Sequence, residues 1–192
     1  GDGTSGAHFW GAQCELNSAS YPTSYIPTYG SSVTRSKDLA NLIGSDFTDV
    51  FSGNGTIYAN LELVNNNSSI GWWARLSTTG AYANMIKAEF NGISKKLQVE
   101  IRANNVTEVY FVDTNVSSLG FHKVAVSYNN GDIVIYMDGV KLATYLDRNM
   151  PDLNEIYIGN YTDGGNRFAT KKEFLIFPTA LTDSECIALT TL

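Results

Sequence analysis

Charged residues are scarce in this chain, and basic ones are scarcer than acidic ones. Charged side chains make up 17% of the 192 residues, and 19 acidic residues against 13 basic ones give a net charge of −6. Binding to nucleic acid or to an anionic membrane surface needs clustered Lys or Arg. We therefore predict that neither is a partner.

Long apolar runs and targeting signals are also missing. No run approaches the ~18 apolar residues of a membrane-spanning helix, so we predict no membrane insertion. No signal peptide is recognisable. Because the chain begins with Gly1 rather than Met, we expect it to be a processed or excised part of a longer protein.

Cysteine is rare, with only Cys14 and Cys186, near opposite ends of the chain. A single distant pair is not the disulfide framework of a small secreted domain. We favour two free thiols, and a bridge between the two cysteines is the alternative.

Catalytic patterns are absent as well. Glycoside hydrolysis needs two carboxylates flanking the scissile bond, but Glu62, Glu89 and Glu100 each stand alone in a predicted strand. The only histidines are His8 and His122, and there is no Gly-x-Ser-x-Gly elbow, phosphate loop or zinc motif. We predict that the chain is not an enzyme and that His122 has a structural role.

What the chain does contain is β pattern, most clearly in residues 120–145. Apolar residues alternate through 122–128, and 133–138 is rich in β-branched and aromatic residues. An Asn-Asn-Gly-Asp run between these segments, and Asp138-Gly139 after them, favour tight hairpin turns. Residues 140–144 alternate again, with Val140, Leu142 and Thr144 on one face. This predicts a meander of three antiparallel strands.

Similar patterns cover most of the chain after residue 32. A helix is predicted only at 181–192, where Thr182 and Glu185 form a capping box and Leu181, Cys186, Ile187 and Leu189 are the apolar residues. A short turn or irregular helix is expected at 47–51. Further strands are expected at 33–35, 38–43 (or one helical turn), 56–64, 70–76, 82–90, 96–103, 106–112, 155–159 and 167–178.

The meander resembles a known family. Its pattern, aromatic-His-Lys-Val-Ala-Val-Ser-Tyr followed by Ile-Tyr-Met-Asp-Gly-Val, is similar to laminin-G-like domains of the concanavalin A-like lectin/glucanase superfamily. The ending, Lys-Glu-Phe-Leu-Ile-Phe-Pro-Thr-Ala-Leu-Thr-Asp-Ser-Glu, resembles the last strand and helix of those domains. The resemblance implies an all-β fold, a two-sheet antiparallel jelly roll with a short C-terminal helix.

A second resemblance concerns the N-terminal part. Trp-Gly-Ala-Gln-x-Glu at 10–15, then Pro-Thr-Ser-Tyr-Ile-Pro-Thr and Val-Thr-Arg-Ser-Lys-Asp, is similar to a junction between modules in bacteriophage tail-fibre and other virion adhesin proteins. It implies that 1–28 ends a preceding module or links to it, and that 29–192 is the laminin-G-like domain. Alternatively, 1–28 is an N-terminal strand of the same domain.

These resemblances imply a non-catalytic, lectin-like recognition module of a tail fibre or virion appendage that binds a host-surface carbohydrate or glycoprotein. A homo-oligomer, such as a trimer, within a larger fibre is implied too. One alternative is a purely structural or oligomerisation module of a fibre. Another is a secreted bacterial carbohydrate-binding module, which would be extracellular rather than in the virion.

Candidate ligand-binding residues combine aromatic rings with hydrogen-bonding groups, because rings stack on sugars and polar groups read hydroxyls. Adjacent strand residues point to opposite faces, so Trp72 and Trp73 cannot enter one core layer. We therefore expect one indole in the core and the other on the outer or concave surface. Trp73, with Arg75 on its face, is the candidate for ligand binding, and both indoles being buried is the alternative. The full candidate set is Trp73, Arg75, Tyr82, Tyr161, Asp163, Asn166 and Arg167.

The family resemblance also implies a candidate Ca²⁺ site at the rim of the sandwich, since oxygen donors in loops suit this ion. The candidate ligands are Asp113, Asn115, Asp163 and Asn166. Ordinary turn chemistry is the alternative explanation for these residues. No other cofactor is expected.

Overall fold

In the computed structural model, the chain divides into two compact units, Gly1–Asp38 and Leu39–Leu192. The boundary predicted at residue 28 stays a prediction, as does the strand at 33–35, which lies outside the described residues. The structure describes residues 29–31, 41–48, 51, 53–63, 70–75, 82–91, 94–113, 118–158 and 171–192, with only the backbone at 41, 48, 70–75, 157, 158 and 171.

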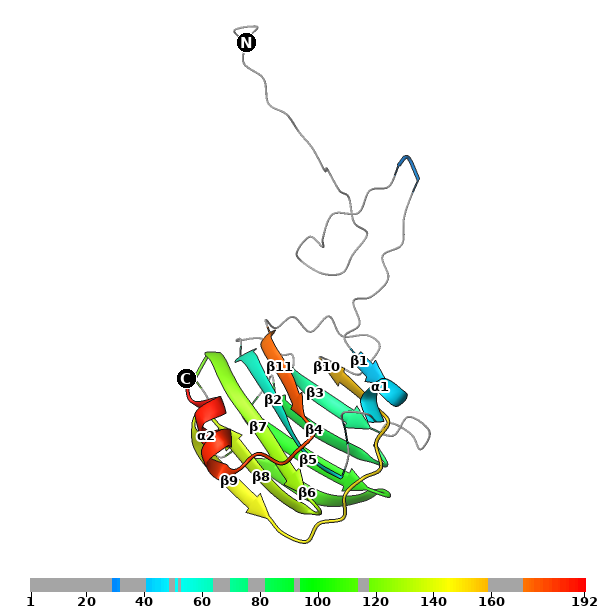
Figure 1. The fold of residues 1–192 in the computed structure, drawn as a ribbon. Coiled ribbons are helices and arrows are strands. Elements are labelled where there is room, and N and C mark those ends of the chain that lie inside the picture. Colours follow the sequence, from blue (N-terminus) through cyan, green and yellow to red (C-terminus); the bar gives the residue numbers. More distant parts are fainter. Residues whose placement is uncertain are drawn as a thin grey trace, which may run out of the picture. The chain divides into compact units, whose positions relative to one another are not determined.

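The second unit contains two antiparallel sheets, which Figure 1 shows as two layers. This confirms the predicted all-β sandwich. The six-stranded sheet has the order β1 (Asn41–Ile43), β10 (Glu155–Ile158), β3 (Ile70–Arg75), β4 (Met85–Phe90), β5 (Leu97–Ala103) and β6 (Val106–Val112). The five-stranded sheet has the order β11 (Lys171–Phe177), β2 (Asn54–Leu63), β7 (Gly120–Asn129), β8 (Asp132–Met137) and β9 (Val140–Tyr145).

The hydrophobic core lies between the two sheets and is built from alternate residues of their strands. In β7 the predicted alternation through 122–128 turns Val124, Val126 and Tyr128 into the core, and β2 alternates in the same way. The short helix α1 (Ser45–Thr48) adds Phe47, whose ring stacks on that of Phe51 at a centroid distance of 4.6 Å. The main buried members are Ile57, Ala59, Leu61, Leu63, Ile86, Ala88, Phe90, Leu97, Val99, Ile101, Val109, Val124, Val126 and Tyr128.

The predicted tight turns of the meander are present. Asn130 and Gly131 between β7 and β8, and Asp138 and Gly139 between β8 and β9, all have positive φ, as a type I′ hairpin turn requires. Any side chain at Gly131 would collide with the backbone, because a Cβ there would lie 2.4 Å from the carbonyl oxygen of Arg148. The β5–β6 turn has the same positive φ at both Asn104 and Asn105.

The predicted alternation in the third strand of the meander is wrong. A β-bulge falls in the β8–β9 ladder, where Ile135 pairs with Ala143 but Tyr136 pairs with Lys141. Leu142 is therefore the extra residue, and the alternation reverses across it. Ala143 and Tyr145, rather than Thr144, share the core side with Leu142.

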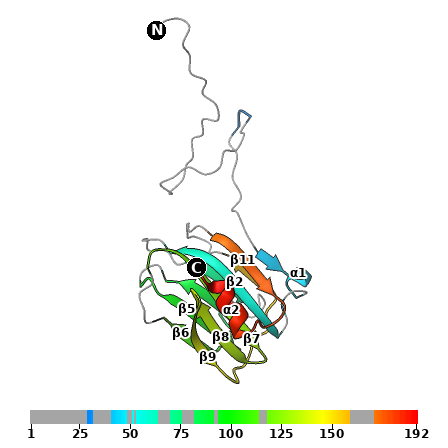
Figure 2. The ribbon, with the colours of Figure 1, turned by 60° about the vertical axis from the view of Figure 1, so that its left-hand side comes forward.

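The C-terminal helix α2 (Asp183–Thr190) covers the outer face of the five-stranded sheet, as Figures 1 and 2 show. Its capping box is as predicted: Thr182 accepts from the Glu185 N–H, and the Glu185 carboxylate accepts from the Thr182 N–H. Cys186, on the buried side of this helix, is a free thiol. Of the apolar residues of this segment, Ile187 is 38% exposed, because only Cys186 and Thr190 of the helix are buried.

No helix among the described residues is long and apolar enough to cross a membrane.

Candidate functional site

The outer face of the six-stranded sheet carries a row of polar and aromatic positions. Pairing places Lys87 of β4 opposite Glu100 of β5, and Glu100 opposite Tyr110 of β6. Directly paired residues of an antiparallel sheet share a face. We call the outward residues Lys87, Glu89, Gln98, Glu100, Arg102 and Tyr110 the polar face.

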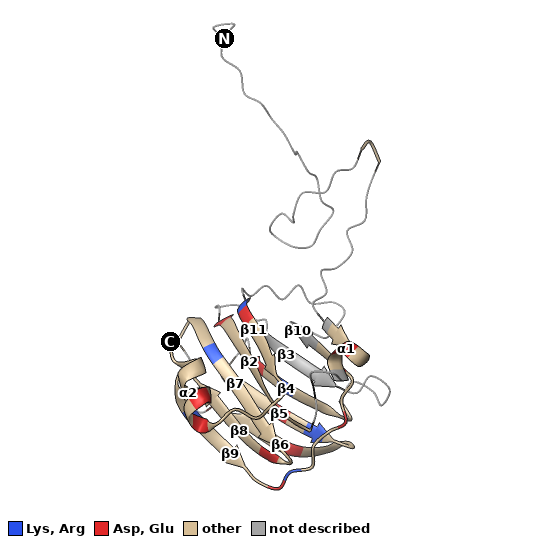
Figure 3. Ribbon diagram, viewed as in Figure 1, with Lys and Arg blue, Asp and Glu red and all other residues tan. Residues whose placement is uncertain are grey.

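The sequence produces this face by alternation. In β4, Ile86, Ala88 and Phe90 enter the core, so Lys87 and Glu89 are turned outward. The same rule applies in β5, where the core residues are Leu97, Val99 and Ile101 and the outward ones are Gln98, Glu100 and Arg102. Figure 3 shows residues of both charge signs on the ribbon near β5 and β6.

The ammonium of Lys87 lies between two carboxylates from neighbouring strands. Its Nζ is 3.4 Å from Glu89 Oε1 and 3.2 Å from Glu100 Oε2. The three side chains are only 8%, 13% and 16% exposed, respectively. These charges are therefore largely withdrawn from water, and each fixes the position of the others.

Exposure increases along the row toward the sheet edge. Tyr110, opposite Glu100 on the edge strand β6, is 59% exposed. A solvent-accessible ring thus lies beside a sheltered group of hydrogen-bonding charges. Arg102 is at the end of the face, where its Nη2 donates to the carbonyl oxygen of Asn105 over 3.2 Å. Its buried Nε has no acceptor among the described residues.

Two of the predicted ligand-binding residues fall in these rows by backbone register. Trp73 pairs with Lys87, and Arg75 pairs with Met85 and with Glu155 of β10. Their side chains lie outside the described part of the chain. Tyr82 is exposed. The strand predicted at 82–90 begins only at Met85, so Tyr82 lies in the turn that precedes β4. Tyr161, Asp163, Asn166 and Arg167 lie outside the described residues.

The predicted Ca²⁺ site is described at one position only. Asp113 follows β6 and is buried, and its N–H donates to the carbonyl oxygen of Leu97. Asn115, Asp163 and Asn166 lie outside the described residues. No group of three or more acidic, His or Cys side chains that could hold a metal ion occurs within the described ranges. Calcium binding therefore stays a prediction.

His122 has the structural role predicted for it. Its Nδ1 is 2.6 Å from Asp138 Oδ2, and its Nε2 is 2.6 Å from the carbonyl oxygen of Ser118. Both partner atoms are acceptors, so both ring nitrogens donate when the imidazole is charged. The hydrogen bond with Asp138 raises the pKa of His122, although burial opposes the shift.

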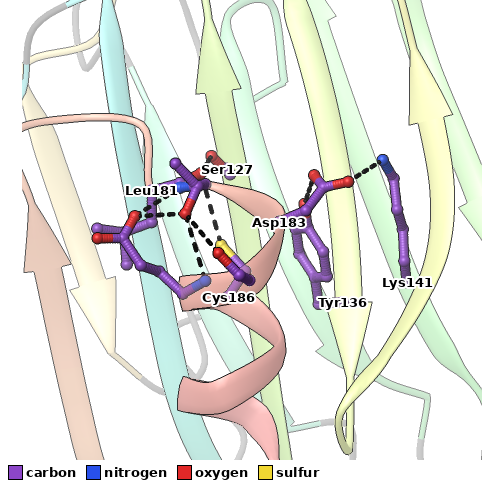
Figure 4. A network of polar contacts seen from close by, with 9 residues as sticks. Ser127, Tyr136, Lys141, Leu181, Asp183 and Cys186 are labelled. Carbon is purple, nitrogen blue, oxygen red and sulfur yellow. Dashed lines mark hydrogen bonds and ion pairs between the residues drawn. The ribbon is translucent and has the colours of Figure 1, made fainter.

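A second polar network holds α2 against the five-stranded sheet (Figure 4). The hydroxyl of Tyr136 donates to Asp183 Oδ1 over 2.6 Å, and Lys141 Nζ lies 2.8 Å from Asp183 Oδ2. Beside it, Ser127 donates to the carbonyl oxygen of Leu181. Burial raises the pKa of the Cys186 thiol to about 11, so this cysteine is not an activated nucleophile.

Lys87, Glu100 and Tyr110 were not among the residues predicted to form a site. The signal that could have identified them is the coincidence of two polar alternations, Lys87 with Glu89 and Gln98 with Glu100, in strands that follow one another. Such alternation also describes an ordinary solvated face. Burial of the charges, which the sequence does not give, separates the two cases.

Comparisons with known proteins agree on the fold. No protein-family model matches the chain, and no curated protein matches it in sequence. The structure is similar to the CBM40 of Ruminococcus gnavus IT-sialidase bound to α2,3-sialyllactose, with 16% identity, a TM-score of 0.58, and coverage of 74% of this chain and 85% of that one.

Two further solved structures are similar over much of this chain. One is leech intramolecular trans-sialidase, with 18% identity and a TM-score of 0.57; the match covers 73% of this chain but only 23% of that one. The other is the heptameric SAP-like pentraxin of Limulus polyphemus, with 11% identity, a TM-score of 0.52, and coverage of 70% and 68%. At these identities the likeness shows a two-sheet jelly-roll fold and nothing about ligands.

Proposed function

We propose that this chain is a non-catalytic carbohydrate-binding module and that the polar face is its binding surface. The observation that carries the proposal is the exposed Tyr110 ring in register with Glu100, whose position is fixed by Lys87. Sugars are bound where a ring can stack on their apolar face beside groups that read their hydroxyls. The similar CBM40, described as bound to sialyllactose, supports the view that this fold can present a sugar site.

The preformed ion pairs favour binding. A ligand that orders flexible side chains loses affinity through their conformational entropy. Here Lys87 already restricts both Glu89 and Glu100. Most of that entropy is therefore lost on folding rather than on binding.

The same geometry supports binding over hydrolysis. A retaining or inverting glycosidase keeps the space between its two carboxylates open for the scissile bond or for a water. The Lys87 ammonium lies within 3.4 Å of both Glu89 and Glu100 and fills that space. A non-catalytic role is therefore proposed for this pair.

The test is a glycan array followed by calorimetry on the strongest binder, with and without calcium. Tyr110→Ala should weaken binding about tenfold, in line with the ~1.4 kcal/mol at the upper end of aromatic stacking. Val106→Ala is the matched control, because Val106 is on the same strand and is 57% exposed. Equal losses in both variants, no binding by the wild type, or release of sugar from a polysaccharide would each contradict the proposal.

We further propose the finer role of an extracellular recognition module in a virion tail fibre, which binds a host-surface glycan or glycoprotein. The support is the tail-fibre-like sequence in residues 10–38. A structural fibre module and a secreted bacterial carbohydrate-binding module are the alternatives. Solution mass measurement of the intact chain tests the trimer that the fibre role implies. A monomer that still binds glycan would favour the bacterial module.

A further inference from the structure

We infer that the polar face selects neutral sugars over anionic ones. This inference rests on the proposed function and specifies the class of glycan that the face would accept. It depends on which charges of the face already form ion pairs with one another, as Lys87, Glu89 and Glu100 do.

The cation at the centre of the face is not available to an anionic ligand. Lys87 Nζ contacts Glu89 and Glu100 at 3.4 and 3.2 Å, so two negative charges surround one positive charge. A sugar carboxylate or sulfate that approached Lys87 would meet both glutamates. Because these side chains are little exposed, water screens that repulsion less than it would at an open surface.

The other described charges do not reverse this balance. Glu155 of β10 is outward, since its neighbour Ile156 is in the core, and it is buried. The guanidinium of Arg102 is held at the end of the face by the carbonyl oxygen of Asn105. Arg75 shares the row by backbone register, and its direct pairing partner is Glu155, so the formal charges of these two positions cancel. The cation at the centre of the face, Lys87, is already shared between Glu89 and Glu100.

Neutral sugars, by contrast, match what the face offers. An ionised carboxylate has about four lone-pair sites, and Lys87 contacts one oxygen of each glutamate. The remaining sites of Glu89 and Glu100 can accept hydroxyl groups in charge-assisted hydrogen bonds, which are the stronger kind. A ring stacked on Tyr110 would place its hydroxyls toward Glu100, directly across the ladder.

The experiment uses the intact chain on a broad glycan array, followed by competition with lactose and 3′-sialyllactose, which differ by one sialic acid. We expect the bound glycans to be neutral. Each neutral glycan should bind at least ten times more tightly than its sialylated form. The affinity for the neutral glycan should change less than twofold between low and high salt. Binding only to anionic glycans, or tighter binding of sialylated forms, would overturn the inference but leave carbohydrate binding intact. No binding to any glycan would instead count against the proposed function itself.

A charge variant tests the cause. Glu89→Gln/Glu100→Gln removes the two negative charges that lie beside Lys87, so the preference for neutral over sialylated glycan should fall at least tenfold. Asp152→Asn, in an exposed loop, removes a carboxylate elsewhere and should leave the preference unchanged. If the double variant does not fold, Glu100→Gln alone should shift the preference in the same direction. An unchanged preference in a folded variant would contradict the assignment to these glutamates.

Discussion

The two outer faces of the sandwich each carry a lysine paired with carboxylate, but in opposite surroundings. On the side of the five-stranded sheet, Lys141 of β9 and Asp183 of α2 form an ion pair whose side chains are 38% and 58% exposed. On the six-stranded sheet, Lys87 is 8% exposed and contacts two glutamates. Exposed ion pairs contribute little to stability, whereas buried charges are costly unless they are paired.

The difference supports the proposal that one face is scaffold and the other is the binding surface. The groups beneath α2 bond to one another and to backbone atoms, so their chemistry is complete within the fold. The polar face holds sheltered carboxylates with acceptor sites left over, next to an exposed aromatic ring. The first arrangement stabilises a helix, and the second is suited to a ligand.

The largest expected effect is on the polar face. Lys87→Met leaves two little-exposed carboxylates without their shared cation, so we expect the free energy of unfolding to fall by about 3 kcal/mol, as for other broken buried ion pairs. Urea denaturation measures it. The matched variant on the other face, Lys141→Met, should be indistinguishable from wild type. Equal losses in the two variants would erase the distinction between the faces.

A smaller effect is expected beneath α2. The Thr56 hydroxyl accepts from the Leu181 N–H at 2.9 Å and lies 3.2 Å from Ser127 Oγ. Thr56→Val keeps the shape but leaves buried polar groups unsatisfied, which costs about 2 kcal/mol. Denaturation should show this loss, while glycan affinity of the folded variant stays unchanged. A parallel loss of affinity would show that the two faces are coupled.

The smallest effect concerns His122, which packs between the sheets, with Phe90 of the six-stranded sheet 5.3 Å away. Hydrogen bonding to Asp138 raises its folded-state pKa above the ordinary value of about 6.5. The added stability is complete below that ordinary value and is lost as pH rises through the folded-state pKa. Unfolding measured from about pH 6 upward should therefore show declining stability, with a shallower slope in His122→Gln. Identical slopes would contradict the ion pair.

Much of the fold could be predicted from local pattern. Alternation in residues 122–128 identified the core face of β7, and the Asn130-Gly131 and Asp138-Gly139 pairs identified the turns, because these signals lie within a few residues. The bulge at Leu142 could not be predicted, since it exists only as a mismatch between β9 and the strand it pairs with.

The candidate site was harder to predict for a related reason. Trp73 and Arg75 were chosen because aromatic and basic residues in one strand suggest a ligand. Glu89 and Glu100 were each considered alone, because they belong to different strands. Glu89 shares a face of β4 with Lys87, but only the pairing of β4 with β5 brings Glu100 to the same lysine. That register is set by turns and core packing rather than by any property of the two glutamates.

The position of β2 in its sheet has a consequence for folding order. Its neighbours are β7 and β11, so Ile57 pairs with both Val126 and Ile176 although these lie far along the chain. The meanders β4–β6 and β7–β9 need only short loops and can form early, while the β2 pairings must close long loops and form late. During synthesis one edge of β2 therefore stays unpaired until β7 is made, and the other until β11 is made. This is the stage at which the chain is most open to misassociation.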